Sequence, residues 1–286
     1  MLKAEIEKLY KDHTMDDQRN LQLSKCISYG ELVIQEIINQ KKKITNSDLI
    51  VLVIYRKILE LLDGLFLLAD HQSYSSSVIV LRSLFETSTN FVYILIDPKK
   101  IEERTNYYYV GYALEEIKVC EALISNGKNN STFSADKLQK TIDGHFINLN
   151  GKHNEIYKEW MQLKEKLATQ RRNPDFYPHW YSVFRGPRSL KQLAEKANLK
   201  DIYEQIYSNF SLESHGFVSL TGLRKTKDDG VKFLPLRSDN PLKMQTYLGT
   251  RLFLMCTSYL IKIYLIHQLE DFEDFLEDIN EHFILS

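Results

Sequence analysis

The spacing of apolar residues is the feature that most constrains the fold of this chain, because it repeats every three or four positions over most of the 286 residues. Such a repeat places apolar side chains on one face of an α-helix. Only 11 Gly and 6 Pro interrupt the pattern. Hydrophobic residues make up 43% of the chain and charged residues 26%, which is ordinary for a protein with a large core. The sequence therefore predicts an all-α fold, a helical bundle.

Turn-forming residues divide the chain into helical segments. In the first half of the chain we expect helices over about 15–42, 48–71, 73–96 and 98–126, the second of them after a turn at 45–48. In the second half we expect two short helices that begin at 134 and at 189, and longer ones over about 153–172, 200–215 and 242–267. Two long irregular connections, 173–188 and 216–241, separate some of them, and the second has room for a short hairpin. We expect an N-terminal helical arm (1–46), one bundle domain (47–268) and an acidic C-terminal helix (269–286).

Charge and cysteine content exclude several classes of protein. The formal net charge of −1 gives no general attraction to nucleic acid or to an anionic membrane. Charged residues interrupt the most apolar stretches, 49–69 and 78–96, so we expect buried helices rather than membrane spans. Cys26, Cys120 and Cys256 have neither zinc-site nor CxxC spacing, and the N-terminus lacks the apolar core of a signal peptide. These features predict a cytoplasmic protein.

One predicted helix carries a polar stripe, which we define as Tyr203, Tyr207, Ser211 and His215. A step of four residues keeps these side chains on one face of the helix. His215 precedes Gly216, a typical residue just beyond a helix C-terminus, where the helix dipole favours the protonated imidazole. His215 is therefore a candidate general acid or base, with Ser211 and Tyr207 orienting it or a phosphate. The alternative is a histidine that caps its own helix.

A second candidate feature is Arg82 followed four residues later by Glu86, within an otherwise apolar helix. This spacing lets the two side chains form an ion pair. The pair either fixes helix packing or presents Arg82 as a cation for a phosphate, with Glu86 orienting it. The residue pattern alone leaves both alternatives open.

The first irregular connection mixes cations with aromatic residues, a combination that holds phosphates and stacks on bases. Its candidate substrate-binding residues are Arg171, Arg172, Trp180, Arg185 and Arg188. The alternative is a loop whose aromatic residues cover the core and whose arginines are solvated. Because the chain has no HExxH, EF-hand, GxGxxG or Walker motif, we expect no metal and no cofactor.

Two stretches carry a resemblance to a known family: Val80–Glu86, and Leu190–Glu195 followed by Tyr203–His215. They resemble the signature stretches of an uncharacterised bacterial domain-of-unknown-function family that is similar to the all-helical HEPN superfamily, and the resemblance spans about 47–267. It implies a metal-independent ribonuclease with an arginine, a short spacer and a histidine on one helix. It also implies a homodimer that acts in phage defence or with an antitoxin partner.

The chain departs from the implied motif, because the helix that bears His215 has no arginine before it. Two hypotheses follow. In the first, the protein is a ribonuclease in which His215 acts as acid or base, Arg82 and Glu86 supply the cation, and Tyr207 and Ser211 position the phosphate. In the second, it is a non-enzymatic module that binds a nucleotide, a nucleic acid or a partner protein.

Overall fold

The chain forms two compact units, each described by itself. Unit 1 combines Met1–Pro98 with Ala197–Ser286, and unit 2 is Lys99–Lys196. The computed structural model describes residues 17–125, 134–173, 176–214, 223–225, 230–233 and 242–284. Nearly all of these residues are helical, which confirms the all-α prediction. The unit boundaries, at 98/99 and 196/197, differ from the domain boundaries that we expected at 46/47 and 268/269.

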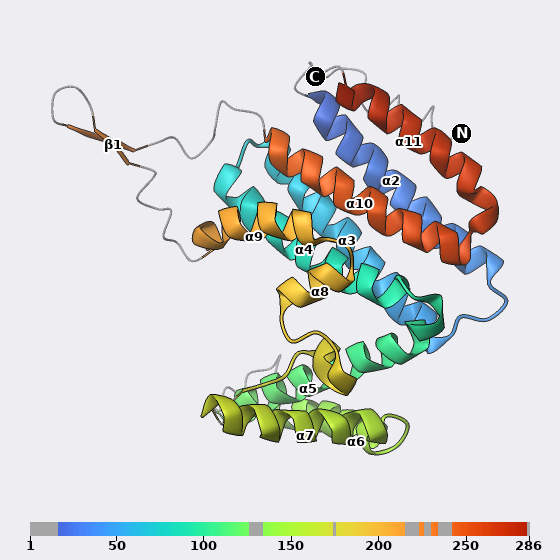
Figure 1. Ribbon diagram of the computed structural model, residues 1–286, viewed down its shortest axis with the longest axis vertical. Helices are drawn as coiled ribbons and strands as arrows, with labels where there is room; N and C mark the ends of the chain where they lie inside the picture. The colour runs from blue at the N-terminus through green and yellow to red at the C-terminus, as the bar shows by residue number, and fades with distance from the viewer. Residues whose placement is uncertain are drawn as a thin grey trace. The chain divides into compact units, whose positions relative to one another are not determined.

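Unit 1 is a bundle in which helices distant in sequence lie side by side (Figure 1). Its helices are α2 (Asp17–Gln40), α3 (Asn46–Asp70), α4 (Tyr74–Leu95), α9 (Lys200–Ser214), α10 (Lys243–Tyr264) and α11 (Leu269–Ile284). Helix α3 contacts α2, α4 and α10, and α9 packs on α4. The helix in the described part of the predicted N-terminal arm is thus α2, which belongs to this bundle.

The centre of unit 1 combines aromatic packing with a buried polar contact. Tyr55 on α3 is fully buried, and its hydroxyl shares a 2.7 Å hydrogen bond with the Thr257 hydroxyl on α10. The ring of Tyr55 lies 6.4 Å from that of Phe253. Gly30 on α2 permits this close packing, because a Cβ atom there would lie 2.5 Å from the Leu59 side chain. The bond satisfies both hydroxyls, which would otherwise be costly to bury.

The turn before α3 forms a capping box, in agreement with the N-cap predicted at this turn. The Thr45 hydroxyl accepts a hydrogen bond from the Asp48 amide, and the Asp48 carboxylate accepts one from the Thr45 amide. Lys41 lies 2.6 Å from the same carboxylate. Burial of Asp48 raises the pKa of its carboxyl, but the bonds from Lys41 and Thr45 outweigh it and hold this pKa below its usual value.

Helix α11 packs on α2 through its apolar face. Phe272 is 2% exposed, and the Phe275 ring stacks on Tyr29 of α2 at 4.1 Å. Lys25 on α2 pairs with Asp278 at 2.8 Å. The prediction of an acidic terminal helix is therefore incomplete: the acidic residues form one face, and the other face is buried in unit 1.

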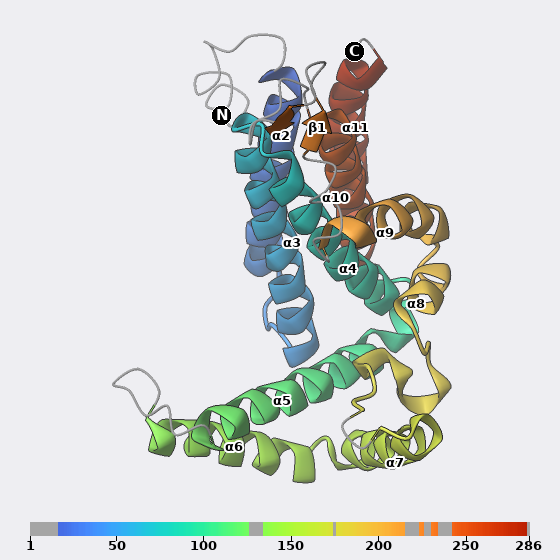
Figure 2. The same ribbon diagram turned by 90° about the vertical axis from the view of Figure 1, so that its left-hand side faces the viewer.

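Unit 2 is a smaller helical assembly with its own core (Figure 2). Its elements are the 3₁₀ turn η1 (Pro98–Lys100), α5 (Ile101–Ser125), α6 (Ala135–Asn150), α7 (Asn154–Arg171), the 3₁₀ segment η2 (Trp180–Arg185) and α8 (Leu190–Lys196). Helix α5 contacts α6, α7 and η2. The buried core residues are Val110, Ala113, Leu114, Ile117, Cys120, Ile142, Leu149, Trp160 and Val183. His145 on α6 binds Glu116 on α5 at 2.7 Å and links these two helices.

The two predicted irregular connections contain short ordered elements. The first includes η2, whose backbone is non-helical at Val183 and Phe184. The second includes an antiparallel hairpin of β1 (Leu223–Lys225) and β2 (Val231–Phe233), the element for which we expected room. The rest of the second connection lies outside the described residues.

Among the described residues, one helix is long and apolar enough to cross a membrane. This helix is α4, but 56% of the residues in its most apolar window are buried within the protein. It also carries the charged residues Arg82 and Glu86. Both properties are typical of a helix in a protein core, as the interrupted apolar pattern predicts.

Candidate functional site

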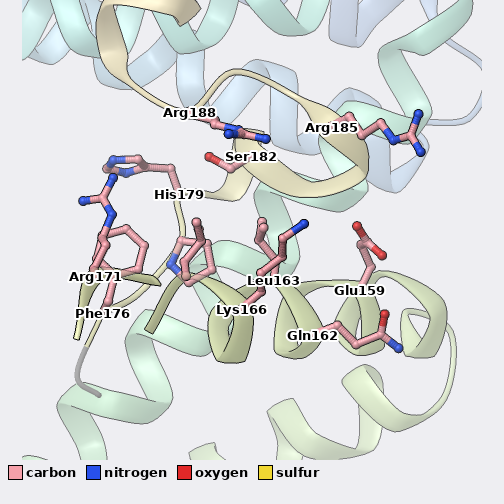
Figure 3. A pocket seen from close by; sticks show the side chains of 12 residues that line it. Glu159, Gln162, Leu163, Lys166, Arg171, Phe176, His179, Ser182, Arg185 and Arg188 are labelled. Atoms are coloured by element: carbon pink, nitrogen blue, oxygen red, sulfur yellow. The ribbon is translucent and has the colours of Figure 1, made fainter. Parts of the chain in front are cut away.

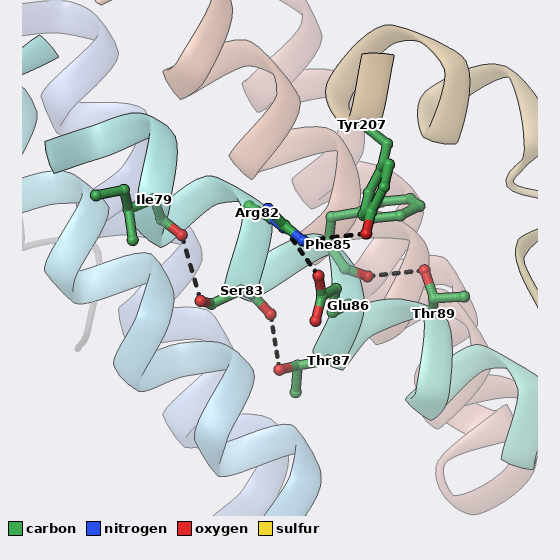
Figure 4. Close-up of polar contacts among 8 residues, drawn as sticks. All are labelled: Ile79, Arg82, Ser83, Phe85, Glu86, Thr87, Thr89 and Tyr207. Carbon is green, nitrogen blue, oxygen red and sulfur yellow. Dashed lines mark hydrogen bonds and ion pairs between the residues drawn. The ribbon is translucent and has the colours of Figure 1, made fainter. Parts of the chain in front are cut away.

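Arg82 is the centre of a polar cluster in unit 1 that joins α4 to α9 (Figure 4). Its Nε atom donates to Glu86 Oε1 at 3.1 Å, which is the ion pair expected from their spacing. Its Nη2 atom donates to the Tyr207 hydroxyl at 3.0 Å. The guanidinium carbon also lies 4.7 Å from the centre of the Tyr207 ring. We call Arg82, Glu86 and Tyr207 the arginine cluster.

Aromatic packing supports the tyrosine of this cluster. The Tyr203 and Tyr207 rings stack with a 4.9 Å separation of centres, and the Tyr203 ring lies 6.3 Å from that of Phe85 on α4. Burial and the neighbouring Tyr207 raise the pKa of the Tyr203 phenol, while Arg82 opposes that change. The first two residues of the polar stripe therefore lie together at the contact between α4 and α9.

The other half of the polar stripe consists of Ser211 and His215. Ser211 belongs to α9, one turn beyond Tyr207, but its side chain lies outside the described residues. His215 follows the last residue of α9 and lies outside them entirely. The structure thus brings three predicted site residues together, Arg82, Glu86 and Tyr207, and leaves the roles of Ser211 and His215 as predictions.

A cavity of about 260 Å³ forms a second candidate site, within unit 2. It lies between one face of α7 and the loop 176–188 (Figure 3). Its lining residues are Glu159, Gln162, Leu163, Lys166, Leu167, Arg171, Phe176, Pro178, His179, Ser182, Arg185 and Arg188. None of them belongs to the arginine cluster, so the chain has two distinct candidate sites.

The predicted substrate-binding residues divide between this cavity and the rest of the loop. Arg171, Arg185 and Arg188 line the cavity. Arg172 does not line the cavity: it follows the last residue of α7, has a left-handed backbone conformation and is exposed. Trp180 does not line it either, because its ring packs edge-on against Tyr108 of α5 at 5.3 Å. Trp180 therefore anchors the loop to α5. This agrees with the alternative in which the aromatic residues of the loop cover the core.

Close contacts of glycine residues fix the loop that covers the cavity. A Cβ atom at Gly111 of α5 would lie 2.4 Å from the Trp180 Cβ, so only glycine lets the loop approach α5 this closely. A Cβ atom at Gly186 would lie 1.9 Å from the Tyr181 carbonyl oxygen. Arg185 itself has a positive φ of 65°, a strained conformation for a residue other than glycine. The backbone thus fixes the direction in which the Arg185 side chain leaves the loop.

Nine of the twelve lining residues were not among our predicted binding residues, and they include Lys166, Phe176 and His179. A signal for Lys166 was available, because Glu159, Gln162 and Lys166 have the spacing of one helix face. Phe176 lies under the Arg171 guanidinium at 4.2 Å. The His179 ring stacks on Tyr181 at 4.9 Å. Phe176 and His179 lie in an irregular segment, where no periodicity marks the side that faces a cavity.

Within the described part of the chain, no three His, Cys, Asp or Glu side chains form a group able to hold a metal ion. Cys26, Cys120 and Cys256 are buried free thiols. Burial raises the pKa of the Cys256 thiol to about 12, which makes this cysteine a poor nucleophile.

The fold and the sites define a class: an all-α protein whose core helix presents an Arg–Glu pair to a tyrosine of a neighbouring helix. The chain belongs to DUF5677, a family of unknown function whose model matches residues 48–231. That segment includes the arginine cluster and the unit 2 cavity. No curated protein and no solved structure matches the chain.

Proposed function

We propose that the protein is a metal-independent ribonuclease whose active site lies where α4 meets α9. The observation that carries the proposal is the 3.0 Å hydrogen bond from Arg82 to Tyr207, two residues that are 125 positions apart in the sequence. It brings the one cation of α4 to the helix that bears the polar stripe. The similarity to the HEPN superfamily, drawn from the motifs of these two helices, supports the same function.

The proposed chemistry needs a cation and proton transfer but no metal. The RNA 2′-hydroxyl attacks the neighbouring phosphorus, so the 2′-oxygen–phosphorus bond forms as the 5′-oxygen–phosphorus bond breaks. The attacking hydroxyl loses a proton to a base, and the leaving oxygen receives one from an acid; His215 supplies one of these roles. Arg82 stabilises the charge on the phosphoryl oxygens, because a guanidinium binds such oxygens with two donors.

Glu86 and Tyr207 have positioning roles in this mechanism. Glu86 accepts from Nε and Tyr207 from Nη2, which fixes the plane of the Arg82 guanidinium. Only 19% of the Arg82 side chain is exposed, whereas 41% of that of Glu86 is. The cation is therefore partly desolvated, and its attraction for a phosphate is stronger than in bulk water. Ser211, one turn further along α9, completes the proposed phosphate contacts.

RNA cleavage in the presence of EDTA tests the proposal. Wild-type protein should cleave, and Arg82→Met and His215→Ala should each lose at least a hundredfold in rate, since each removes charge stabilisation or proton transfer. Arg56→Met is the matched control, because Arg56 is an exposed arginine of unit 1 outside the cluster. Equal cleavage by wild type and His215→Ala, or none by folded wild type, overturns the proposal.

A second candidate function is a non-enzymatic module that binds a nucleotide, nucleic acid or partner protein. The observation that favours it is that Glu86 and Tyr207 already occupy the Arg82 guanidinium, so a phosphate has to share this cation. A thermal-shift screen with nucleotides and RNA separates the two functions. Stabilisation without turnover, lost in Arg82→Met, supports the binding module.

The biological setting that we propose follows from the same similarity. The protein would act in the cytoplasm of a bacterium, in phage defence or in a toxin–antitoxin pair, with an antitoxin or another defence protein as partner. A homodimer would bring two polar stripes into one cleft. The buried free cysteines suit a reducing compartment.

A further inference from the structure

We infer that the cavity of unit 2 is a binding site for a nucleoside phosphate. The phosphate would contact Lys166, Arg185 and Arg188, and the base would stack on the planar surface formed by Arg171 and Phe176. This inference uses unit 2 alone and does not depend on the proposed ribonuclease function.

Charge is the first argument for an anionic ligand. Lys166, Arg171, Arg185 and Arg188 line the cavity, and Glu159 is the one acidic residue among its described lining. The whole chain has a net charge of −1, so this excess of cations is local. Among the described residues, none of the four cations forms an ion pair, whereas Arg82, Lys41 and Lys25 all do. All four are exposed and, in the part of the chain that the structure describes, not engaged by acidic side chains, so they are available to an anionic ligand.

The kind of cation points to phosphate. Three of the four are arginines, whose planar guanidinium groups each offer paired donors to the oxygens of a phosphate. They come from two different elements, since Arg171 ends α7 while Arg185 and Arg188 lie on the loop. A phosphate presents oxygens in several directions and can bond to both sides of the cavity.

The remaining lining suits a nucleoside. The Arg171 guanidinium lies 4.2 Å from the centre of the Phe176 ring, and bases stack readily on guanidinium and phenyl planes. Leu163 and Pro178 give the cavity an apolar part, which an inorganic anion would not need. Figure 3 shows Arg171, Phe176 and His179 at one end and Glu159 with Gln162 at the other. The volume of about 260 Å³ is slightly below the lower limit of about 300 Å³ for ligand pockets, so part of a bound nucleotide would extend into solvent.

The loop holds its cations in a defined geometry. Phe184 and Arg185 both have positive φ angles, 49° and 65°. Such strain persists where the surrounding structure imposes it, and it is concentrated at functional sites. The Tyr107 ring stacks on Phe184 at 5.2 Å, and the Arg188 amide donates to the Gln192 side chain at 2.8 Å. The loop is thus organised before a ligand arrives, which lowers the entropic cost of binding.

Calorimetric titration of the full-length protein tests the inference with AMP, adenosine and a single-stranded RNA octamer. AMP should bind, and adenosine should bind at least tenfold more weakly because it lacks the phosphate. Arg185→Gln and Arg188→Gln should each weaken AMP binding about tenfold, the loss typical of one charged hydrogen bond. Arg172→Gln should stay within about twofold, since it removes the same charge from the same segment but outside the cavity.

The RNA octamer distinguishes the two sources of the nucleotide. If RNA binds more tightly than AMP and AMP competes with it, the ligand of the cavity is an RNA strand. If AMP binds more tightly than RNA, the ligand is a free nucleotide. If a loop variant fails to fold, Lys166→Gln on α7 makes the same test from the helix side. The inference is overturned if AMP does not bind, if adenosine binds equally well, or if Arg172→Gln weakens binding as much as Arg188→Gln. Ribonuclease activity is not measured, so either proposal can fail alone.

Discussion

The hydrogen bond between Arg82 and Tyr207 links α4 to α9, and a double-mutant cycle can measure its strength. Tyr207→Phe removes the hydroxyl and keeps the ring that stacks on Tyr203. Arg82→Met removes the charge and keeps most of the aliphatic stem. The cycle isolates the coupling between the two groups, provided that neither variant makes new contacts.

The expected magnitude follows from the contacts. A hydrogen bond to a charged donor contributes about 1.5–3 kcal/mol when buried, and less here because Tyr207 is only half-buried. We therefore expect Tyr207→Phe to lower the free energy of unfolding by about 1 kcal/mol. Arg82→Met should destabilise by about 1.5–2 kcal/mol, because it also loses the cation–π contact and the pair with Glu86. The coupling energy should be about 1 kcal/mol.

Urea unfolding followed by circular dichroism provides the assay. With a slope of about 2 kcal/mol per molar urea, a loss of 1 kcal/mol lowers the midpoint by about 0.5 M. Tyr203→Phe is the control, because the Tyr203 ring stacks like that of Tyr207 but no hydrogen bond of its hydroxyl occurs among the described residues. It should change stability by less than about 0.5 kcal/mol. A coupling energy near zero, or equal losses in Tyr203→Phe and Tyr207→Phe, would refute the reasoning.

Two further predictions concern the turn before α3 and the cavity loop. Asp48→Asn should destabilise by about 1–3 kcal/mol at pH 7, because it removes the charge that binds Lys41 and Thr45. The pKa of Asp48 is lowered by folding, so its contribution is present above the unfolded value of about 3.9 and is lost as the pH falls through the folded value. Gly186→Ala should displace the loop and abolish AMP binding, whereas Gly144→Ala, with nothing within 4 Å, should be neutral or stabilising.

Urea midpoints of wild type and Asp48→Asn at pH 7 and pH 3 check the first of these two predictions, and a stability difference that grows at acid pH would contradict it. Tryptophan fluorescence and AMP titration check the second, since Trp160 and Trp180 both lie in unit 2. Unchanged AMP affinity in Gly186→Ala would show that the close contact does not control the loop.

Local features of the fold could be predicted from sequence because their causes are local. The N-caps at Thr45 and Ser134 depend on a side chain bonding to an amide three residues away. The Arg82–Glu86 pair depends only on a spacing of four residues in one helix. The buried face of α11 is also visible in the sequence, because Phe272, Phe275 and Ile279 recur at three- and four-residue spacing; our prediction considered only the acidic residues.

The candidate sites depended on long-range packing. The spacing within the cavity loop did not indicate that Arg172 and Trp180 would lie away from the cavity while Arg185 and Arg188 would line it. Which side chains of an irregular segment face inward depends on close contacts such as that of Gly186 with the Tyr181 carbonyl. These contacts have no periodicity that a sequence pattern can reveal.

Helix periodicity and capping act over a few residues, so the all-α class, most of the helix limits and the charged positions within apolar helices follow from the sequence. The two units, the contact of Arg82 with Tyr207 across 125 positions, and the cavity lined by cations of α7 and its following loop do not. Such contacts arise when helices pack, and packing depends on the shapes of all the side chains at an interface.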